Sequence, residues 1–299
     1  MARKGRDVRV RDRRVAWAMM LPWLVGLAAF VVGPMLASFA LAFTQYSILT
    51  PPKFVGLQNF IYAVQSASVL NSWVVTIVYG LLGTLFTLSL ALGAGLLLYH
   101  SHHLNGMWRT LYYFPTLLSG AAEGLIMSGT WAPNGLVDRV LESVGLPAPP
   151  WLASTTWALP AVTLARYWTI GTGILLFLGA RANVAPQLYE AISVDGGRRW
   201  AQFRYVTLPM ISPLLLLNLI LGVLGSFQAF SQVWLMTGGG PGSTTLIMSI
   251  YIYLVSFGDL RFGYGAAVSW LFFVFLLGLT GLIFVSSRKW VYYEAGDFR

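Results

Sequence analysis

Cysteine is absent from this 299-residue chain, and charged side chains are scarce. Without cysteine, the chain has no disulfide bond, no thiolate metal site and no cysteine nucleophile. Charged residues make up 10% of the chain, whereas a soluble domain has about a quarter. Hydrophobic residues make up 57%, and the mean hydropathy is +0.69. The composition predicts a polytopic membrane protein, whose helices are surrounded by lipid.

Nucleotide-binding and catalytic motifs are missing too. No G-x-x-x-x-G-K-[ST] sequence occurs, so the chain has no P-loop to hold the phosphates of ATP. The three histidines, His100, His102 and His103, share one short loop, and no H-E-x-x-H sequence occurs. We interpret this loop as a polar helix end rather than a metal site, because no carboxylate or cysteine lies nearby. No catalytic residue, metal or cofactor is expected in the chain, with an intramembrane hydrolase or glycosyltransferase as the enzyme alternative.

Apolar segments predict six transmembrane helices, so the expected fold class is an all-α polytopic membrane protein. The expected spans are 15–43, 70–99, 110–131, 157–180, 209–236 and 264–286. A basic cytoplasmic arm (1–14) precedes the transmembrane domain (15–286), and a cytoplasmic tail (287–299) follows it. The apolar alternation around 136–144 predicts a short surface helix in the loop after the third span.

The net charge of +9 reflects the distribution of the basic residues along the chain. Seven of them precede the first apolar segment: Arg3, Lys4, Arg6, Arg9, Arg11, Arg13 and Arg14. With six spans, fifteen of the nineteen basic residues lie on the side of the termini and three on the opposite side, with Arg166 inside a span. Because cytoplasmic loops carry the excess of Lys and Arg, we expect both termini and the loop 181–208 to be cytoplasmic. Nucleic-acid binding is the alternative reading of the basic arm.

A polar, turn-rich stretch at 189–209 interrupts the apolar segments. The residues 190–192 can form a short helix, and Gly196 and Gly197 can end it, because glycine adopts backbone angles that other residues resist. Pro209 and Pro213 suit the first turn of the next helix. The sequence therefore predicts a helix, a sharp bend and a second helix entering the membrane, an arrangement suited to docking a soluble partner.

This stretch resembles the EAA loop of permease subunits of bacterial ATP-binding-cassette (ABC) importers, in the form found in sugar importers. The motif is carried by Glu190-Ala191, Asp195-Gly196, Phe203 and Val206-x-Leu208-Pro209. Ile192 stands where the family usually has a second alanine, and Val206 replaces an isoleucine. The resemblance extends over nearly the whole chain through Asn59-Phe60, Phe114-Pro115 and Gly238-Gly239-Gly240-Pro241.

The resemblance implies the six-helix fold of type I ABC importer permeases, with a cytoplasmic coupling helix between helices 4 and 5. It also implies four partners: a second permease subunit, a pair of ATPase subunits that hold ATP and Mg²⁺, an extracytoplasmic solute-binding protein, and membrane lipid. The implied ATPase-coupling residues are Glu190, Ala191, Asp195, Gly196, Gly197, Leu208 and Pro209. The implied location is the bacterial cytoplasmic (inner) membrane.

Small and polar side chains share one face of the fifth span and part of the fourth. Such groups are costly in lipid and tend to face a cavity, although small residues also form helix-packing seams. The predicted cavity residues are Trp168, Thr169, Thr172, Asn218, Gly222, Ser226, Ala229 and Gln232. In the sugar importers that the chain resembles, this region holds the substrate, here a di- or oligosaccharide. Glycerol phosphate is the alternative substrate, and an ion-coupled carrier is the alternative mechanism.

Two opposite charges, Glu123 and Arg166, lie within the third and fourth spans at a similar depth from their outer ends. An unpaired charge at this depth would be expensive, so we hypothesise an ion pair that joins the two spans. Direct contact of either group with substrate is the alternative.

Overall fold

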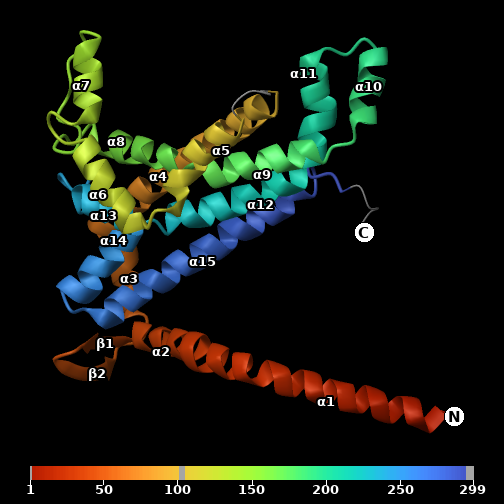
Figure 1. Ribbon diagram of the computed structural model, residues 1–299. Helices are drawn as coiled ribbons and strands as arrows, with labels where there is room; N and C mark the ends of the chain where they lie inside the picture. Colours follow the sequence, from red (N-terminus) through yellow and green to blue (C-terminus); the bar gives the residue numbers. More distant parts are fainter. Residues whose placement is uncertain (1, 101–104, 294–299) are drawn as a thin grey trace. The chain divides into compact units, whose positions relative to one another are not determined.

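Residues 2–100 and 105–293 are described by the structure, a computed structural model (Figure 1). His102, His103 and the end of the predicted tail lie outside the described residues. The chain divides into two compact units: Met1–Val64 with Ile252–Leu271, and Gln65–Tyr251 with Phe272–Arg299. Apart from one small hairpin, every regular element is a helix, which confirms the predicted all-α class for the described chain.

The first unit begins with a long helix and continues into a hairpin. α1 (Ala2–Leu27) and α2 (Gly33–Ala42) are joined by the π-helical turn η1 (Ala28–Val32), just before Pro34, which has no N–H to donate. β1 (Thr44–Ser47) and β2 (Thr50–Phe54) then form an antiparallel pair. The expected spans 15–43 and 70–99 leave this stretch as a loop. The hairpin accommodates Pro51 and Pro52 because both strands of a two-stranded sheet are edges, where proline is tolerated. α3 (Gln58–Gln65) follows.

The second unit holds most of the remaining helices (Figure 1). In chain order they are α4 (Ala67–His100), α5 (Asn105–Tyr113), η2 (Phe114–Leu117), α6 (Gly120–Thr130), α7 (Leu136–Ser143), α8 (Ala158–Ala165), η3 (Arg166–Thr169), α9 (Gly171–Ala182), α10 (Pro186–Val194), α11 (Arg199–Gln202), η4 (Phe203–Thr207), α12 (Leu208–Phe227), α13 (Ser231–Thr237) and α14 (Met248–Tyr253). η5 (Leu254–Gly258) belongs to the first unit, and α15 (Phe262–Ser287) extends through both. The predicted surface helix around 136–144 is present as α7.

Four helical segments of the described chain are long and apolar enough to cross a membrane: Val15–Ala42, Ala67–Tyr99, Arg199–Phe227 and Phe262–Ser287. A fifth is Ala158–Thr169 with Gly171–Ala182, which together bend by 47°. The remaining expected span, 110–131, is not one helix. The chain passes from α5 through the 3₁₀ turn η2, which contains Pro115, and Ser119 caps a separate helix, α6. The count of six spans therefore stays a prediction.

The expected fifth span, 209–236, differs from the structure at both ends. The helix begins at Arg199, so Pro209 is not in its first turn. The π-helical turn η4 accommodates the proline: the Leu208 N–H reaches back five residues to the Phe203 carbonyl. The helix then ends at Phe227, and α13 starts only at Ser231. The periodic pattern crosses this break without any glycine or proline between 228 and 230, which is why the sequence did not reveal it.

α4, α9 and α12 pack against one another in the core of the second unit. Their buried cluster includes Ala91, Ile174, Phe177 and Ile211. A Cβ atom at Gly95 of α4 would lie 3.0 Å from the Ile174 carbonyl oxygen. The missing side chain therefore lets α4 approach α9 closely, as small residues do between membrane helices.

Gly171, at the start of α9, is the tightest glycine contact of this unit. A Cβ atom there would lie 2.7 Å from the carbonyl carbon of Tyr112, so backbone would have to move. We expect Gly171→Ala to destabilise the protein by about 1–3 kcal/mol, as overpacking does, and to lower the apparent Tm in detergent. Gly179→Ala in the same helix meets nothing within 4 Å and is the matched control, with an unchanged or raised Tm. Equal losses in both variants would contradict the packing argument.

Candidate functional site

The predicted short helix before the bend is α10, and the two glycines end it in different ways. Gly196 has φ of +77°, and its N–H donates to the Ser193 carbonyl at 3.1 Å. The Gly197 N–H donates to the Ile192 carbonyl at 2.8 Å, which completes a Schellman motif. Nothing lies within 4 Å of a Cβ at Gly196, whereas one at Gly197 would lie 2.8 Å from the Ile192 oxygen. Gly196 is thus required by its backbone angle and Gly197 by lack of space.

One face of α10 contacts the long helices. The Arg181 guanidinium lies between two rings, 3.8 Å from the centroid of Tyr189 in α10 and 4.3 Å from that of Tyr99 in α4. The hydroxyl groups of Tyr189 and Thr207 are 3.0 Å apart. Because these contacts join α10 to α4, α9 and η4, a force applied to α10 reaches all three.

The outer face of α10 is free of such contacts within the described chain. Glu190 and Ala191 are exposed, and so are the apolar side chains of Leu188 and Val194, the latter by 87%. An exposed carboxylate beside apolar side chains is a surface suited to a protein partner. Of the other predicted coupling residues, Asp195 caps the helix, and Leu208 and Pro209 lie partly buried where η4 joins α12.

A cavity of about 270 Å³ lies where α4, α6, η3, α12 and α13 meet. Its lining residues are Tyr79, Gly120, Glu123, Arg166, Thr169, Gly225, Ala229, Phe230, Ser231 and Gln232. Four of them carry a buried polar atom without a hydrogen-bond partner in the described chain: the Tyr79 hydroxyl, Glu123 Oε1, Arg166 Nη1 and Gln232 Nε2. Buried polar groups are nearly always satisfied, so this concentration indicates a site for a polar ligand or water.

Glu123 and Arg166, the hypothesised ion pair, both line this cavity. No hydrogen bond joins Glu123 Oε1 to Arg166 Nη1. The Arg166 guanidinium lies 5.7 Å from the centroid of the Tyr79 ring. The two charges therefore line the same space, which brings donors and an acceptor to whatever occupies it.

A second cavity, of about 260 Å³, continues along α4, α9 and α12. Four predicted cavity residues line it: Thr169, Thr172, Asn218 and Gly222. Thr169 also lines the first cavity, together with the predicted Ala229 and Gln232. Six of the eight residues predicted from helical periodicity thus line one of these two adjoining cavities.

The other two predicted cavity residues lie elsewhere. The Ser226 hydroxyl is buried and lies 2.7 Å from that of Thr84, in a seam between α12 and α4. Trp168 lines neither cavity and is 36% exposed. Helical periodicity places a residue on a face, but only the packed neighbours decide whether that face is a seam, a cavity or the outer surface.

α4 also contributes residues to both cavities, and these were not predicted from the sequence. Tyr79 lines the first cavity, and Thr84 and Thr87 line the second. The Thr87 hydroxyl is buried and has no partner in the described chain. Their signal was available, since polar side chains in a long apolar helix tend to face a cavity or one another.

The fold is that of the membrane component of a bacterial ABC importer. The chain superposes on a chain of a bacterial ABC transporter involved in the import of the acidic polysaccharide alginate, with a TM-score of 0.83 and 23% sequence identity. The alignment covers 96% of this chain and 99% of that one. A second structure of the alginate transporter, in complex with its periplasmic protein bound to an alginate pentasaccharide, gives the same TM-score at 22% identity.

The chain belongs to the family of binding-protein-dependent transport system inner membrane components, whose profile matches residues 104–292. It is 31% identical to the probable ABC transporter permease YesP of Bacillus subtilis, over 99% of this chain and 97% of that protein. It is 28% identical to the trehalose/maltose transport permease MalF of Thermococcus litoralis, over 98% and 97%. It is 26% identical to the lactose transport permease LacF of Rhizobium radiobacter, over 91% and 94%.

Proposed function

We propose that this chain is the membrane-spanning permease subunit of an ABC importer that moves a di- or oligosaccharide across the cytoplasmic membrane by alternating access. The observation that carries the proposal is the cavity that Tyr79, Glu123, Arg166 and Gln232 line, each with one buried polar atom that has no hydrogen-bond partner in the described chain. Three donors and a carboxylate acceptor match the hydroxyl groups of a sugar, which both donate and accept. The names of the lactose and trehalose/maltose permeases among its relatives support this substrate class.

The alternative substrate, glycerol phosphate, fits the cavity less well. A phosphate carries up to two negative charges and is best matched by clustered bases. Here Arg166 is the one base among the residues that line the cavity, and Glu123 places a carboxylate beside it. A neutral, hydroxyl-rich ligand avoids this repulsion.

Transport would be driven from outside the chain. Since the sequence has no P-loop, ATP and Mg²⁺ would be held by two partner ATPase subunits. Their groove would receive the exposed face of α10 on the cytoplasmic side, where the positive-inside rule also places both termini. A second permease subunit would complete the path, and a solute-binding protein would deliver the sugar on the outer side.

The test is sugar-stimulated ATPase activity of the complex reconstituted with the solute-binding protein and both permeases. We expect stimulation by a di- or oligosaccharide and none by glycerol phosphate. Gln232→Leu is expected to raise the half-saturating sugar concentration about tenfold, because it removes one hydrogen bond to substrate. Ser128→Ala is the matched control: Ser128 bonds only to its own helix at Leu125 and lines neither cavity. Stimulation by glycerol phosphate alone would contradict the sugar assignment.

A further inference from the structure

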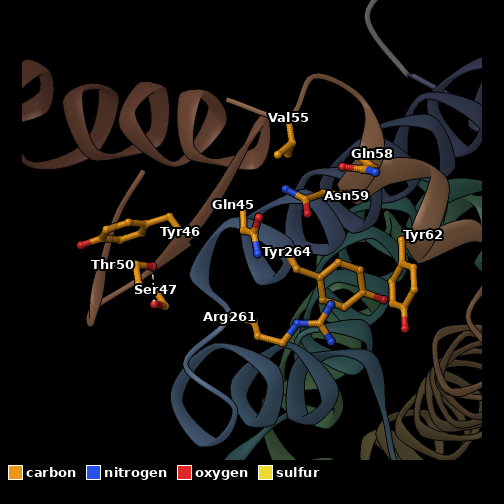
Figure 2. Close-up of a pocket in the computed structure, with 10 residues that line it drawn as sticks. All are labelled: Gln45, Tyr46, Ser47, Thr50, Val55, Gln58, Asn59, Tyr62, Arg261 and Tyr264. Atoms are coloured by element: carbon orange, nitrogen blue, oxygen red, sulfur yellow. Dashed lines mark hydrogen bonds between the residues drawn. The ribbon is translucent and has the colours of Figure 1, made fainter. Parts of the chain in front are cut away.

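A third cavity, of about 320 Å³, lies entirely within the first unit, and we call it the outer pocket (Figure 2). Its walls are the β1–β2 hairpin, α3 and the beginning of α15. Its lining residues are Gln45, Tyr46, Ser47, Thr50, Val55, Gln58, Asn59, Tyr62, Arg261 and Tyr264. Its volume lies in the range of small-molecule sites.

The walls of the outer pocket are fixed to each other by direct contacts. The Asn59 amide donates to the carbonyl oxygens of both Ala42 and Thr44, at 2.9 Å each, which joins α3 to the start of the hairpin. A Cβ atom at Gly263 would overlap the Thr44 carbonyl oxygen, so the first turn of α15 lies directly against β1. The pocket is therefore preformed, which lowers the entropic cost of binding a ligand.

Arg261 is the one charged residue among the ten that line the outer pocket. Its guanidinium lies 4.5 Å from the ring centroid of Tyr264 and 5.4 Å from that of Tyr62 (Figure 2). Within the described chain it has no ion pair and donates no hydrogen bond from its side chain. Asp259 is near in sequence but does not line the pocket. The rings hold the guanidinium in place while leaving its N–H donors free.

The position of Arg261 adds to the positive potential. It immediately precedes α15, a helix of 26 residues with no acidic residue in its first turn. A cation is unfavourable at a helix N-terminus, where the helix dipole favours an anion. The positive charge of Arg261 therefore has no acidic partner in the pocket, and the helix dipole of α15 adds to it. A carboxylate is the planar anion that a guanidinium binds with paired hydrogen bonds.

The rest of the lining matches a sugar ring rather than a bare anion. Gln45, Gln58, Ser47 and Thr50 supply amide and hydroxyl groups, and the two hydroxyls lie 2.9 Å apart. Such groups pair with the hydroxyl edges of a sugar, and Tyr46 offers an aromatic surface for its apolar face. Arg261 already covers the Tyr62 and Tyr264 rings, so a neutral sugar could not stack on them. An acidic sugar can instead form an ion pair with the guanidinium.

We infer that the outer pocket binds a carboxylate-bearing sugar unit, such as a uronic acid residue of an oligosaccharide, separately from the two cavities among the membrane helices. Under the orientation proposed above, on which this inference rests, the hairpin and the start of α15 are extracytoplasmic. The pocket would thus hold the acidic end of a saccharide on the outer side of the membrane.

The test is binding of galacturonic acid to the complex in lipid nanodiscs, without ATP or solute-binding protein, measured by ligand-observed NMR titration. Galactose has the same ring without the charge, and glutamate has a carboxylate without the ring. We expect saturable binding of galacturonic acid, and binding of both comparison ligands weaker by roughly tenfold or more. Equal binding of glutamate, or no saturable binding of galacturonic acid, would overturn the inference.

Two charge-removing variants locate the binding. Arg261→Gln is expected to weaken galacturonic acid binding roughly tenfold or more. Lys53→Gln removes a charge from the same hairpin at an exposed residue outside the pocket, and we expect no change. An equal effect of both variants, or none of Arg261→Gln, would contradict the site. In the unmutated complex, absence of galacturonic acid binding together with intact sugar-stimulated ATPase activity would reject this inference alone. Absence of any sugar stimulation together with intact galacturonic acid binding would reject the proposed function instead.

Discussion

Replacing Arg166 by methionine is expected to destabilise the protein by about 3 kcal/mol and to abolish sugar-stimulated ATPase activity. The substitution leaves Glu123 facing the cavity without its opposite charge, and breaking one side of a buried pair costs about 3–5 kcal/mol. We expect the lower end of that range because both side chains are only half-buried and no hydrogen bond joins Glu123 Oε1 to Arg166 Nη1. The apparent Tm in detergent and the ATPase activity of the reconstituted complex are the two measurements.

A second substitution distinguishes an ion pair between Glu123 and Arg166 from direct contact of Arg166 with substrate. If the charges stabilise each other, Glu123→Gln combined with Arg166→Met restores most of the lost Tm, because no charge is left unpaired. If Arg166 instead contacts substrate, its loss lowers sugar affinity and leaves Tm unchanged, and the second substitution rescues nothing. Arg139→Met, on the exposed surface of α7, is the matched control and should affect neither measurement.

Gly196→Pro is expected to lower sugar-stimulated ATPase activity and uptake at least tenfold while leaving membrane insertion intact. Proline fixes φ near −65°, whereas Gly196 has φ of +77°, and proline also removes the N–H that donates to Ser193. The Schellman motif that ends α10 is then lost, and the helix no longer presents Glu190 and Ala191 at a fixed angle. Uptake and insertion are measured on the same membranes.

The chain offers a closely matched control for this substitution. Gly145 also has φ of +77°, and it ends α7 with the same pair of hydrogen bonds, from Gly145 to Glu142 and from Leu146 to Leu141. Gly145→Pro therefore removes the same C-terminal hydrogen bond and backbone angle from α7, which the proposed orientation places on the opposite side of the membrane. Normal uptake in the Gly196→Pro variant, or an equal loss in both, would remove the coupling role from α10. Glu190→Lys tests the exposed carboxylate separately, with an expected loss of uptake but not of insertion.

Composition and local sequence pattern were enough to predict the membrane class, most long helices and the bend after α10. Lipid leaves backbone groups without water to bond to, so long apolar stretches must be helical, and composition suffices to find them. The bend could also be predicted, because glycine adopts backbone angles that few other residues adopt, and Gly196 has such an angle. Most of the residues that helical periodicity predicted for a cavity do line one, because a fixed rotation per residue places Thr169, Thr172 and Asn218 on predictable faces.

The ends of the helices and the convergence of polar groups could not be predicted from the chain one segment at a time. The break in η2, the break at 228–230 and the start of the long helix at Arg199 were found only in the structure. The sequence pattern predicted both Ser226 and Gln232 as cavity residues. In the structure Ser226 packs against Thr84 between two helices, whereas Gln232 lines a cavity. The same holds for Tyr79, Glu123 and Arg166, which lie on three different helical elements. Periodicity describes one helix at a time, whereas a site for a polar ligand exists only where several helices direct unpartnered groups into one space.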